Sequence, residues 1–248
     1  SYVITIMIIG LLGDAYLHKL IPIIVLKIIG LALLFSGVFL FKELNSVTLV
    51  FKKFAGEFKL QPSYYKASTV TVVLISILLF LSSLAPPTDA DSLDYHLGLP
   101  LSWLSADGYA PHYNWFHARF SGLGERVILF GLANGTDVLS SLIQWSGLVI
   151  AIISLNSLSK KQNYQDFMLS SLLVLSVPVI LFLTLNQKPY LFPAASIILA
   201  VSLYFKNGRK SNIELSAISF ILVASVLFKY TFILSVFGMV LVILYDSF

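Results

Sequence analysis

The sequence contains no cysteine and few charged residues. Without cysteine the chain has no disulfide, no thiolate nucleophile and no thiolate metal site. Charged residues make up 11% of its 248 residues, whereas a soluble domain carries about a quarter. Hydrophobic residues make up 58% and the mean hydropathy is +0.90. This composition indicates an integral membrane protein.

Long apolar runs follow one another along the chain. Residues 20–41 contain one charge, Lys27, and residues 67–85 and 167–185 contain none. Each run has close to the ~20 residues that a helix needs to cross a bilayer. Because backbone groups in lipid must be hydrogen-bonded within the segment, these spans are predicted to be helices. With the shorter runs, the sequence predicts an all-α membrane protein, a polytopic transmembrane helix bundle of about eight spans.

The predicted organisation has two parts. Residues 1–66 hold N-terminal spans and a basic loop, and residues 67–248 hold a transmembrane core with one long outer loop at 86–126. No cleavable signal peptide is evident. Since the sequence starts within one apolar run and stops just after another, we expect a partial chain of a longer protein.

Basic residues fall unevenly on the two sides of these predicted spans. One side collects most of them: Lys42, Lys52, Lys53, Lys59, Lys66, Lys160, Lys161, Lys206, Arg209 and Lys210. The positive-inside rule makes that side cytoplasmic, so that loop 86–126 faces the periplasm of a bacterial inner membrane. The net charge of +4 therefore belongs to short loops, and no nucleic-acid partner is expected.

Loop 86–126 concentrates the polar chemistry of the chain. Pro86 and Pro87 end the preceding span, since proline cannot continue a helix. Leucines then recur near helical spacing, and polar residues fall on another face: Leu93, Leu97, Leu101 and Leu104 against Asp91, Asp94, Ser102 and Ser105. This pattern predicts an amphipathic helix lying in the membrane interface, bent or restarted at Pro100.

The aspartates at the start of this helix have two interpretations. Asp91 is a candidate N-cap with Asp94 three residues later, as in a capping box. Capping leaves Asp89 unexplained, so a chemical role stays open. The three histidines of the loop, His96, His112 and His117, match no metal-ligand spacing. Mg²⁺ or Mn²⁺ held by Asp89 and Asp91 together with a substrate phosphate is the more plausible cation site, because Mg²⁺ needs only one or two protein carboxylates.

Four cations lie on the predicted outer side: Arg119, Arg126, Lys188 and Lys229. Taken singly, each is explained by a side chain that reaches toward lipid head groups. Taken together, they are suited to neutralise a phosphate beside the acidic loop. Lys188 and Lys229 stand in turns between apolar runs, where a charge facing lipid is costly and a cavity is its natural place.

One run of residues resembles the signature of a known family: Asp91-Ser-Leu-Asp-Tyr-His-Leu-Gly-Leu-Pro100. It looks like the motif after an early span in bacterial GT-C-type membrane glycosyltransferases, relatives of the dolichyl-phosphate-mannose and aminoarabinose transferases. Weaker similarities follow in the same order at Gly124-Glu125, Gly135-Thr-Asp137, Asn186-Gln-Lys-Pro-Tyr-Leu191 and Phe228-Lys-Tyr-Thr231. The resemblance extends from about Thr69 to Tyr245.

The resemblance implies transfer of a sugar from a polyprenyl-phosphate donor to a lipid, glycan or protein acceptor, by an enzyme embedded in membrane lipids. By motif, Asp91 matches the family's catalytic aspartate, with Asp94 and Asp89 beside it. The candidate substrate-binding residues are Tyr95, His96, His117, Arg119, Glu125, Arg126, Lys188 and Lys229. Some members of the family carry an acidic residue where this chain has Asn186-Gln-Lys188. This departure makes Lys188 a candidate phosphate ligand and leaves open whether the reaction needs a metal.

Two other functions remain open. A non-catalytic subunit of a larger complex would have membrane-protein partners and would not depend on Asp89, Asp91 or Asp94. A transporter would need intramembrane charges or broken helices. Lys27 is the only charge in the middle of a predicted span, and the predicted spans are uninterrupted, which argues against transport.

Overall fold

A computed structural model describes residues 2–40, 56, 58–110, 116–159, 164–206 and 210–246, with the side chains of 34–40 and 117 excepted. Over these residues the chain is all-α, as predicted, and contains no strand. The elements are, in order, α1 (Tyr2–Leu17), α2 (Ile23–Leu40), α4 (Ser63–Ser83), η2 (Ser92–Leu97), α5 (Gly98–Ser105), η3 (Phe116–Phe120), α6 (Leu123–Ala133), α7 (Leu139–Leu158), α8 (Tyr164–Leu175), α9 (Pro178–Leu185), α10 (Leu191–Lys206), α11 (Asn212–Phe228), η4 (Tyr230–Phe232) and α12 (Ile233–Asp246).

Two helices are long and apolar enough to cross a membrane, α4 with 21 residues and α7 with 20. The predicted number of about eight spans is wrong by this measure, because in the described part of the chain the total rises only to three if α8 and α9 count as one broken span. The apolar helices α1 and α10 have 16 residues each. At a rise of 1.5 Å per residue these are about 24 Å long, short of the ~30 Å hydrocarbon core.

The predicted span at 167–185 is interrupted. α8 and α9 meet at an angle of 76° across a short break, and Pro178 begins the second helix. Proline has no N–H to bond the preceding turn and its ring clashes there, so α8 cannot continue through it. The expectation of uninterrupted spans is therefore wrong at this place.

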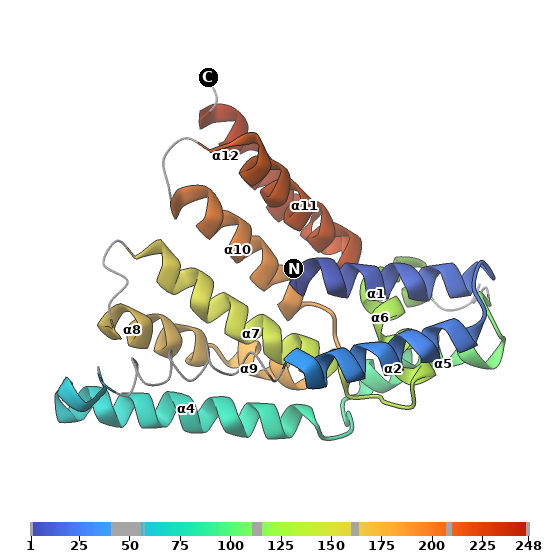
Figure 1. Cartoon of the computed structure of the whole chain (residues 1–248), viewed down its shortest axis with the longest axis horizontal. Helices are drawn as coiled ribbons and strands as arrows, with labels where there is room; N and C mark the ends of the chain where they lie inside the picture. The colour runs from blue at the N-terminus through green and yellow to red at the C-terminus, as the bar shows by residue number, and fades with distance from the viewer. Residues whose placement is uncertain are drawn as a thin grey trace.

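Three packed cores connect the helices. The first joins α1, α5 and α6 around Leu99, Trp103 and Leu129. The second joins α4, α7 and α8, and the third joins α10, α11 and α12. α7 contacts α10, and α10 contacts α11. In Figure 1, α4 runs along one edge of the molecule, and α11 with α12 stands at the opposite edge.

The helix predicted in loop 86–126 is present, but it differs from the prediction in shape. It starts with the π-helical turn η2 and becomes α-helical at Gly98 rather than at Pro100. Leu93 and Leu101 of the predicted leucine stripe are exposed, while Leu99 and Trp103 are buried. A π turn has more residues per turn than an α-helix, so it rotates the later residues away from the face that a regular helical period assigns to them.

The capping assignment also changes. Asp89 Oδ1 accepts a hydrogen bond of 3.0 Å from the backbone N–H of Ser92, whereas Asp91 makes no side-chain cap hydrogen bond. Asp89 is thus the residue that caps this helix, and Asp91 lies within its first turn with its carboxylate available for other contacts.

Candidate functional site: a buried acid–base cluster between four segments

Residues from four distant segments meet around Glu125, in the first turn of α6. Its Oε1 lies 3.0 Å from Nδ1 of His96 in η2 and 3.0 Å from Nζ of Lys229, which precedes η4. Its Oε2 accepts a hydrogen bond of 2.7 Å from the backbone N–H of Gly122. Glu125, His96 and Lys229 are all buried. The carboxylate therefore has a donor for each oxygen, as a buried charge requires.

Aromatic rings enclose the cation of this group. Lys229 Nζ lies 5.4 Å from the ring centre of Tyr95 and 5.2 Å from that of Tyr190. The Tyr95 and His96 rings are 3.8 Å apart, and the Tyr190 ring meets His96 edge-on at 6.3 Å. Ring faces attract a nearby ammonium group, so the two tyrosines stabilise Lys229 away from water. We refer to Tyr95, His96, Glu125, Tyr190 and Lys229 as the buried cluster.

The protonation states follow from burial and neighbours. Burial raises the pKa of Glu125, but the hydrogen bond from His96, the charge of Lys229 and the Gly122 N–H outweigh it and lower that pKa to about 2. Burial, together with the charges of Lys229 and Lys188, lowers the pKa of His96 by more than the Glu125 carboxylate raises it. His96 is therefore neutral at pH 7, and its Nδ1–H donates to Glu125. Its buried Nε2 has no hydrogen-bond partner among the described residues.

A second group lies at the turn between α9 and α10. Lys188 Nζ is 3.0 Å from Asp91 Oδ2 and 3.4 Å from Asp89 Oδ1. The Lys188 and Asp89 side chains are 13% and 20% exposed, while that of Asp91 is 65% exposed. Burial opposes ionisation of both Lys188 and Asp89. The Asp91 and Asp89 carboxylates nevertheless raise the pKa of Lys188, and hydrogen bonding from Ser92 together with the Lys188 charge lowers that of Asp89. We call Asp89, Asp91 and Lys188 the acidic clamp.

Contacts from α7 fix the turn that carries Lys188. Ser140 Oγ donates to the Gln187 carbonyl at 3.0 Å, and Gln187 Nε2 donates to Ser141 Oγ at 2.7 Å. Gln144 Oε1 accepts the first two N–H groups of α10, from Leu191 at 2.9 Å and Phe192 at 3.0 Å. These bonds satisfy helix-start donors that would otherwise be unpaired. The turn is therefore held in one position relative to α7.

Close backbone packing joins this turn to the buried cluster. A Cβ atom added to Gly124 would lie 2.3 Å from Pro189 Cβ. Only glycine at this position allows the first turn of α6, which carries Glu125, to approach the Lys188 turn so closely. The acidic clamp and the buried cluster are therefore neighbouring parts of one site.

The remaining predicted site residues lie apart from these contacts. Asp94 is exposed and forms no ion pair with any residue that the structure describes. Arg126 is bonded to Asp14 of α1 and donates to the Gly122 carbonyl at 2.7 Å, with Trp103 5.9 Å away. Arg119 is exposed on η3, and the His117 side chain lies outside the described residues. Arg126 thus joins α1 to α6.

Three contributors were not singled out from the sequence. Tyr190 lies within the Asn186–Leu191 run that carried a family similarity, so its place in a polar turn was a usable signal. Gly122 bonds Glu125 through its backbone, which no side-chain pattern reports. Asp14 lies more than a hundred residues from Arg126 in sequence, and no local pattern predicts that pairing.

The residues proposed for Mg²⁺ or Mn²⁺ do not fit a metal as they stand. One oxygen of Asp89 and one oxygen of Asp91 already face the Lys188 ammonium, at 3.4 Å and 3.0 Å. Within the described residues no group of three or more His, Asp or Glu side chains is arranged to hold a metal ion. The positive charge at this place is supplied by the protein itself.

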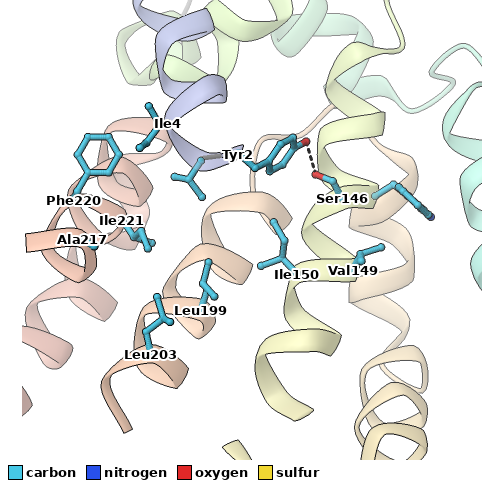
Figure 2. A pocket seen from close by; sticks show the side chains of 12 residues that line it. Tyr2, Ile4, Ser146, Val149, Ile150, Leu199, Leu203, Ala217, Phe220 and Ile221 are labelled. Atoms are coloured by element: carbon cyan, nitrogen blue, oxygen red, sulfur yellow. Dashed lines mark hydrogen bonds between the residues drawn. The ribbon is translucent and has the colours of Figure 1, made fainter. Parts of the chain in front are cut away.

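A cavity of about 680 Å³ lies elsewhere, between the start of α1 and helices α7, α10 and α11 (Figure 2). Its walls are almost entirely apolar, and Tyr2 Oη and Ser146 Oγ share a hydrogen bond of 2.8 Å at its edge. None of the charged residues of the acidic clamp or the buried cluster lines it. The Tyr2 ring meets the Phe192 ring edge-on at 5.9 Å, and the Phe192 ring lies 5.2 Å from that of Phe228.

The family described as the DUF1420 N-terminal domain matches residues 21–247. The chain belongs to the DUF1420 family. The matched DUF1420 region contains every residue of the acidic clamp and the buried cluster, whereas α1, with Asp14, lies before it. No curated protein and no solved structure matches the chain.

Proposed function

We propose that this chain forms the membrane-embedded catalytic region of a glycosyltransferase that moves a sugar from a polyprenyl-phosphate donor to a lipid, glycan or protein acceptor. The observation that carries the proposal is the convergence of side chains that the GT-C resemblance had singled out along the sequence. Asp91, His96, Glu125, Lys188 and Lys229 come from segments up to 138 residues apart (229 − 91) and lie in two adjoining groups.

Asp91 is suited to take the proton of the acceptor hydroxyl, and Lys188 is suited to stabilise the leaving phosphate. Asp91 uses Oδ2 for Lys188, and its side chain is 65% exposed, so the other oxygen is free to meet an acceptor. The acceptor hydroxyl oxygen attacks the anomeric carbon, and its proton passes to that free Asp91 oxygen. The bond from the carbon to the phosphate oxygen breaks, and its electron pair stays on the lipid phosphate. The Lys188 ammonium stabilises the charge that develops there.

The buried cluster fixes the positions of the segments that carry the acidic clamp. His96 and Tyr95 belong to the helix that starts at Asp89, and Glu125 and Lys229 bind that helix to α6 and η4. In this proposal the acidic clamp faces the periplasm of a bacterial inner membrane, on the side opposite the lysine-rich loops. A lipid-borne donor then approaches along the helices, and the acceptor approaches from the aqueous side.

Replacing one oxygen of Asp91 tests the proposal. Purified full-length protein in lipid nanodiscs is given polyprenyl-phosphate-linked sugars and a membrane-lipid acceptor fraction, and transfer is followed by mass spectrometry. We expect Asp91→Asn to lower the rate by about 10²- to 10⁴-fold, the usual contribution of a general base. Asp107→Asn is the matched control, since Asp107 lies in the same loop but bonds to Tyr16 at 3.1 Å. Equal transfer by Asp91→Asn and wild type would remove Asp91 from the mechanism.

Transport of an anionic lipid is a second candidate, favoured by one observation. The bend of 76° between α8 and α9 is a broken helix of the kind that lines substrate sites in transporters. Uptake into proteoliposomes without any sugar transfer would support transport over catalysis. Stable co-purification with another membrane protein, with function retained after loss of Asp89, Asp91 and Asp94, would instead indicate a non-catalytic subunit.

A further inference from the structure

Lys188 occupies an unusual position for a surface lysine. Its ammonium group lies between two carboxylates, 3.0 Å from Asp91 and 3.4 Å from Asp89, and its side chain is 13% exposed. The Phe182 ring lies 5.0 Å from the same nitrogen. A lysine that only reached for solvent would extend away from these groups. The Lys188 side chain is instead directed toward Asp89 and Asp91.

The backbone on both sides holds this arrangement in place. Hydrogen bonds from Ser140 and to Ser141 fix the neighbouring residue Gln187, and Pro189 packs against Gly124. On the acidic side, Asp89 is fixed by the Ser92 N–H. The backbone that carries Lys188 and the Asp89 carboxylate are therefore both positioned by the fold.

Two neighbouring carboxylates repel each other and need a cation nearby. Mg²⁺ and Mn²⁺ are common solutions, and Mg²⁺ requires only one or two protein carboxylates besides its water and phosphate ligands. Here a tethered ammonium already meets both carboxylates. A divalent ion placed between Asp89 and Asp91 would have to displace the Lys188 ammonium from the two carboxylates that attract it. The ion would also be repelled by that ammonium.

We propose that Lys188 is the resident cation of the acidic clamp, taking the place between Asp89 and Asp91 that a divalent ion takes in metal-dependent sites. Without the Lys188 charge, the carboxylate pair would bind a divalent ion. In its catalytic part the inference rests on the proposed function: the donor phosphate meets a protein ammonium rather than a metal, and the reaction proceeds without Mg²⁺ or Mn²⁺.

Binding of Mn²⁺ alone tests the inference without any assay of activity. Metal-stripped full-length protein in nanodiscs of zwitterionic lipid is titrated with Mn²⁺, and the free ion is measured by electron paramagnetic resonance. We expect wild type to bind no more Mn²⁺ than Asp91→Asn does. Lys188→Met, which keeps the length of the side chain and removes its charge, should gain a bound Mn²⁺ that Lys188→Met/Asp91→Asn loses. Lys188→Arg is the matched control, since it keeps the charge and should gain none.

Two results would overturn the inference: Asp91-dependent Mn²⁺ binding by wild type, or a folded Lys188→Met protein that gains no Mn²⁺. If Lys188→Met does not fold, the comparison of wild type with Asp91→Asn alone decides.

A transfer assay separates this inference from the proposed function. We expect chelation by EDTA to leave the wild-type rate unchanged, and Lys188→Met to lose about 100-fold, as for a charge-stabilising donor, with part of the loss restored by added Mn²⁺. Absence of transfer by every variant would count against the glycosyltransferase and leave the Mn²⁺ result standing. Transfer by wild type that requires Mn²⁺ would overturn the inference and leave the glycosyltransferase standing.

Discussion

The substitution Glu125→Gln tests the energetics of the buried cluster most clearly. Glutamine keeps the shape of the side chain and removes the charge that Lys229 and His96 face at 3.0 Å. Its amide group would also direct N–H toward either the Lys229 ammonium or the Gly122 N–H, so that donor faces donor. Removing one partner of a buried ion pair costs about 3–5 kcal/mol, because the other charge stays buried and unpaired. This corresponds to a loss of about a hundred- to a few-thousand-fold in the ratio of folded to unfolded protein.

Equilibrium unfolding of the purified protein in detergent micelles measures this loss, with the buried Trp103 as a fluorescent reporter. Glu214→Gln is the matched control, because Glu214 is an exposed capping-box residue of α11, and we expect a smaller loss there. Glu125→Gln/Lys229→Met removes both charges and should recover most of the stability. If Glu125→Gln were as stable as Glu214→Gln, the assignment of Glu125 as a buried, paired carboxylate would be refuted.

Two further predictions concern pH and packing. Burial lowers the pKa of His96 below the unfolded value of 6.5, so the unfolded chain binds the extra proton. The contribution of His96 to stability is therefore complete above pH 6.5 and is lost as the pH falls below it. Glu125 adds a further loss below pH 4.5, as the pH falls toward its folded pKa of about 2. Unfolding midpoints at about pH 7.5 and 5.5 should therefore differ in wild type and much less in His96→Gln, and an unchanged difference would contradict a neutral buried His96. Gly13→Ala places a Cβ atom 2.5 Å from the Arg126 carbonyl oxygen, whereas Gly238→Ala meets nothing within 4 Å. We expect Gly13→Ala to lose about 1–3 kcal/mol of stability by overpacking and Gly238→Ala to gain up to about 1 kcal/mol from helix propensity, and equal effects would argue against the contact of α1 with α6.

The helical class was predictable because it depends on composition and on the length of apolar runs. The positions of most helices followed as well, since polar turns such as Gln187–Pro189 interrupt the runs. The number of crossings was not predictable in this way. Hydrophobicity along α1 and α10 is high whether these helices cross a bilayer or end within a packed bundle, and only their 16-residue lengths show that they fall short.

The site was predictable where a motif supplied it and unpredictable where long-range packing did. Asp91, His96, Glu125, Lys188 and Lys229 were all candidates from the sequence, but nothing in their spacing separates Lys188, which pairs with Asp91, from Lys229, which pairs with Glu125. The same limit applies to Arg126. A cation near an acidic loop suggests a phosphate ligand, yet its partner is Asp14, on a helix that no local pattern brings to α6.

The most direct test of the central claim is a density map of the full-length protein in nanodiscs with bound polyprenyl phosphate. We predict that the phosphate lies against Lys188, that the free Asp91 oxygen faces the side from which the acceptor approaches, and that the lipid chain continues along the helices. A map in which the phosphate lies elsewhere, or in which another protein covers Asp91 and Asp94, would contradict it.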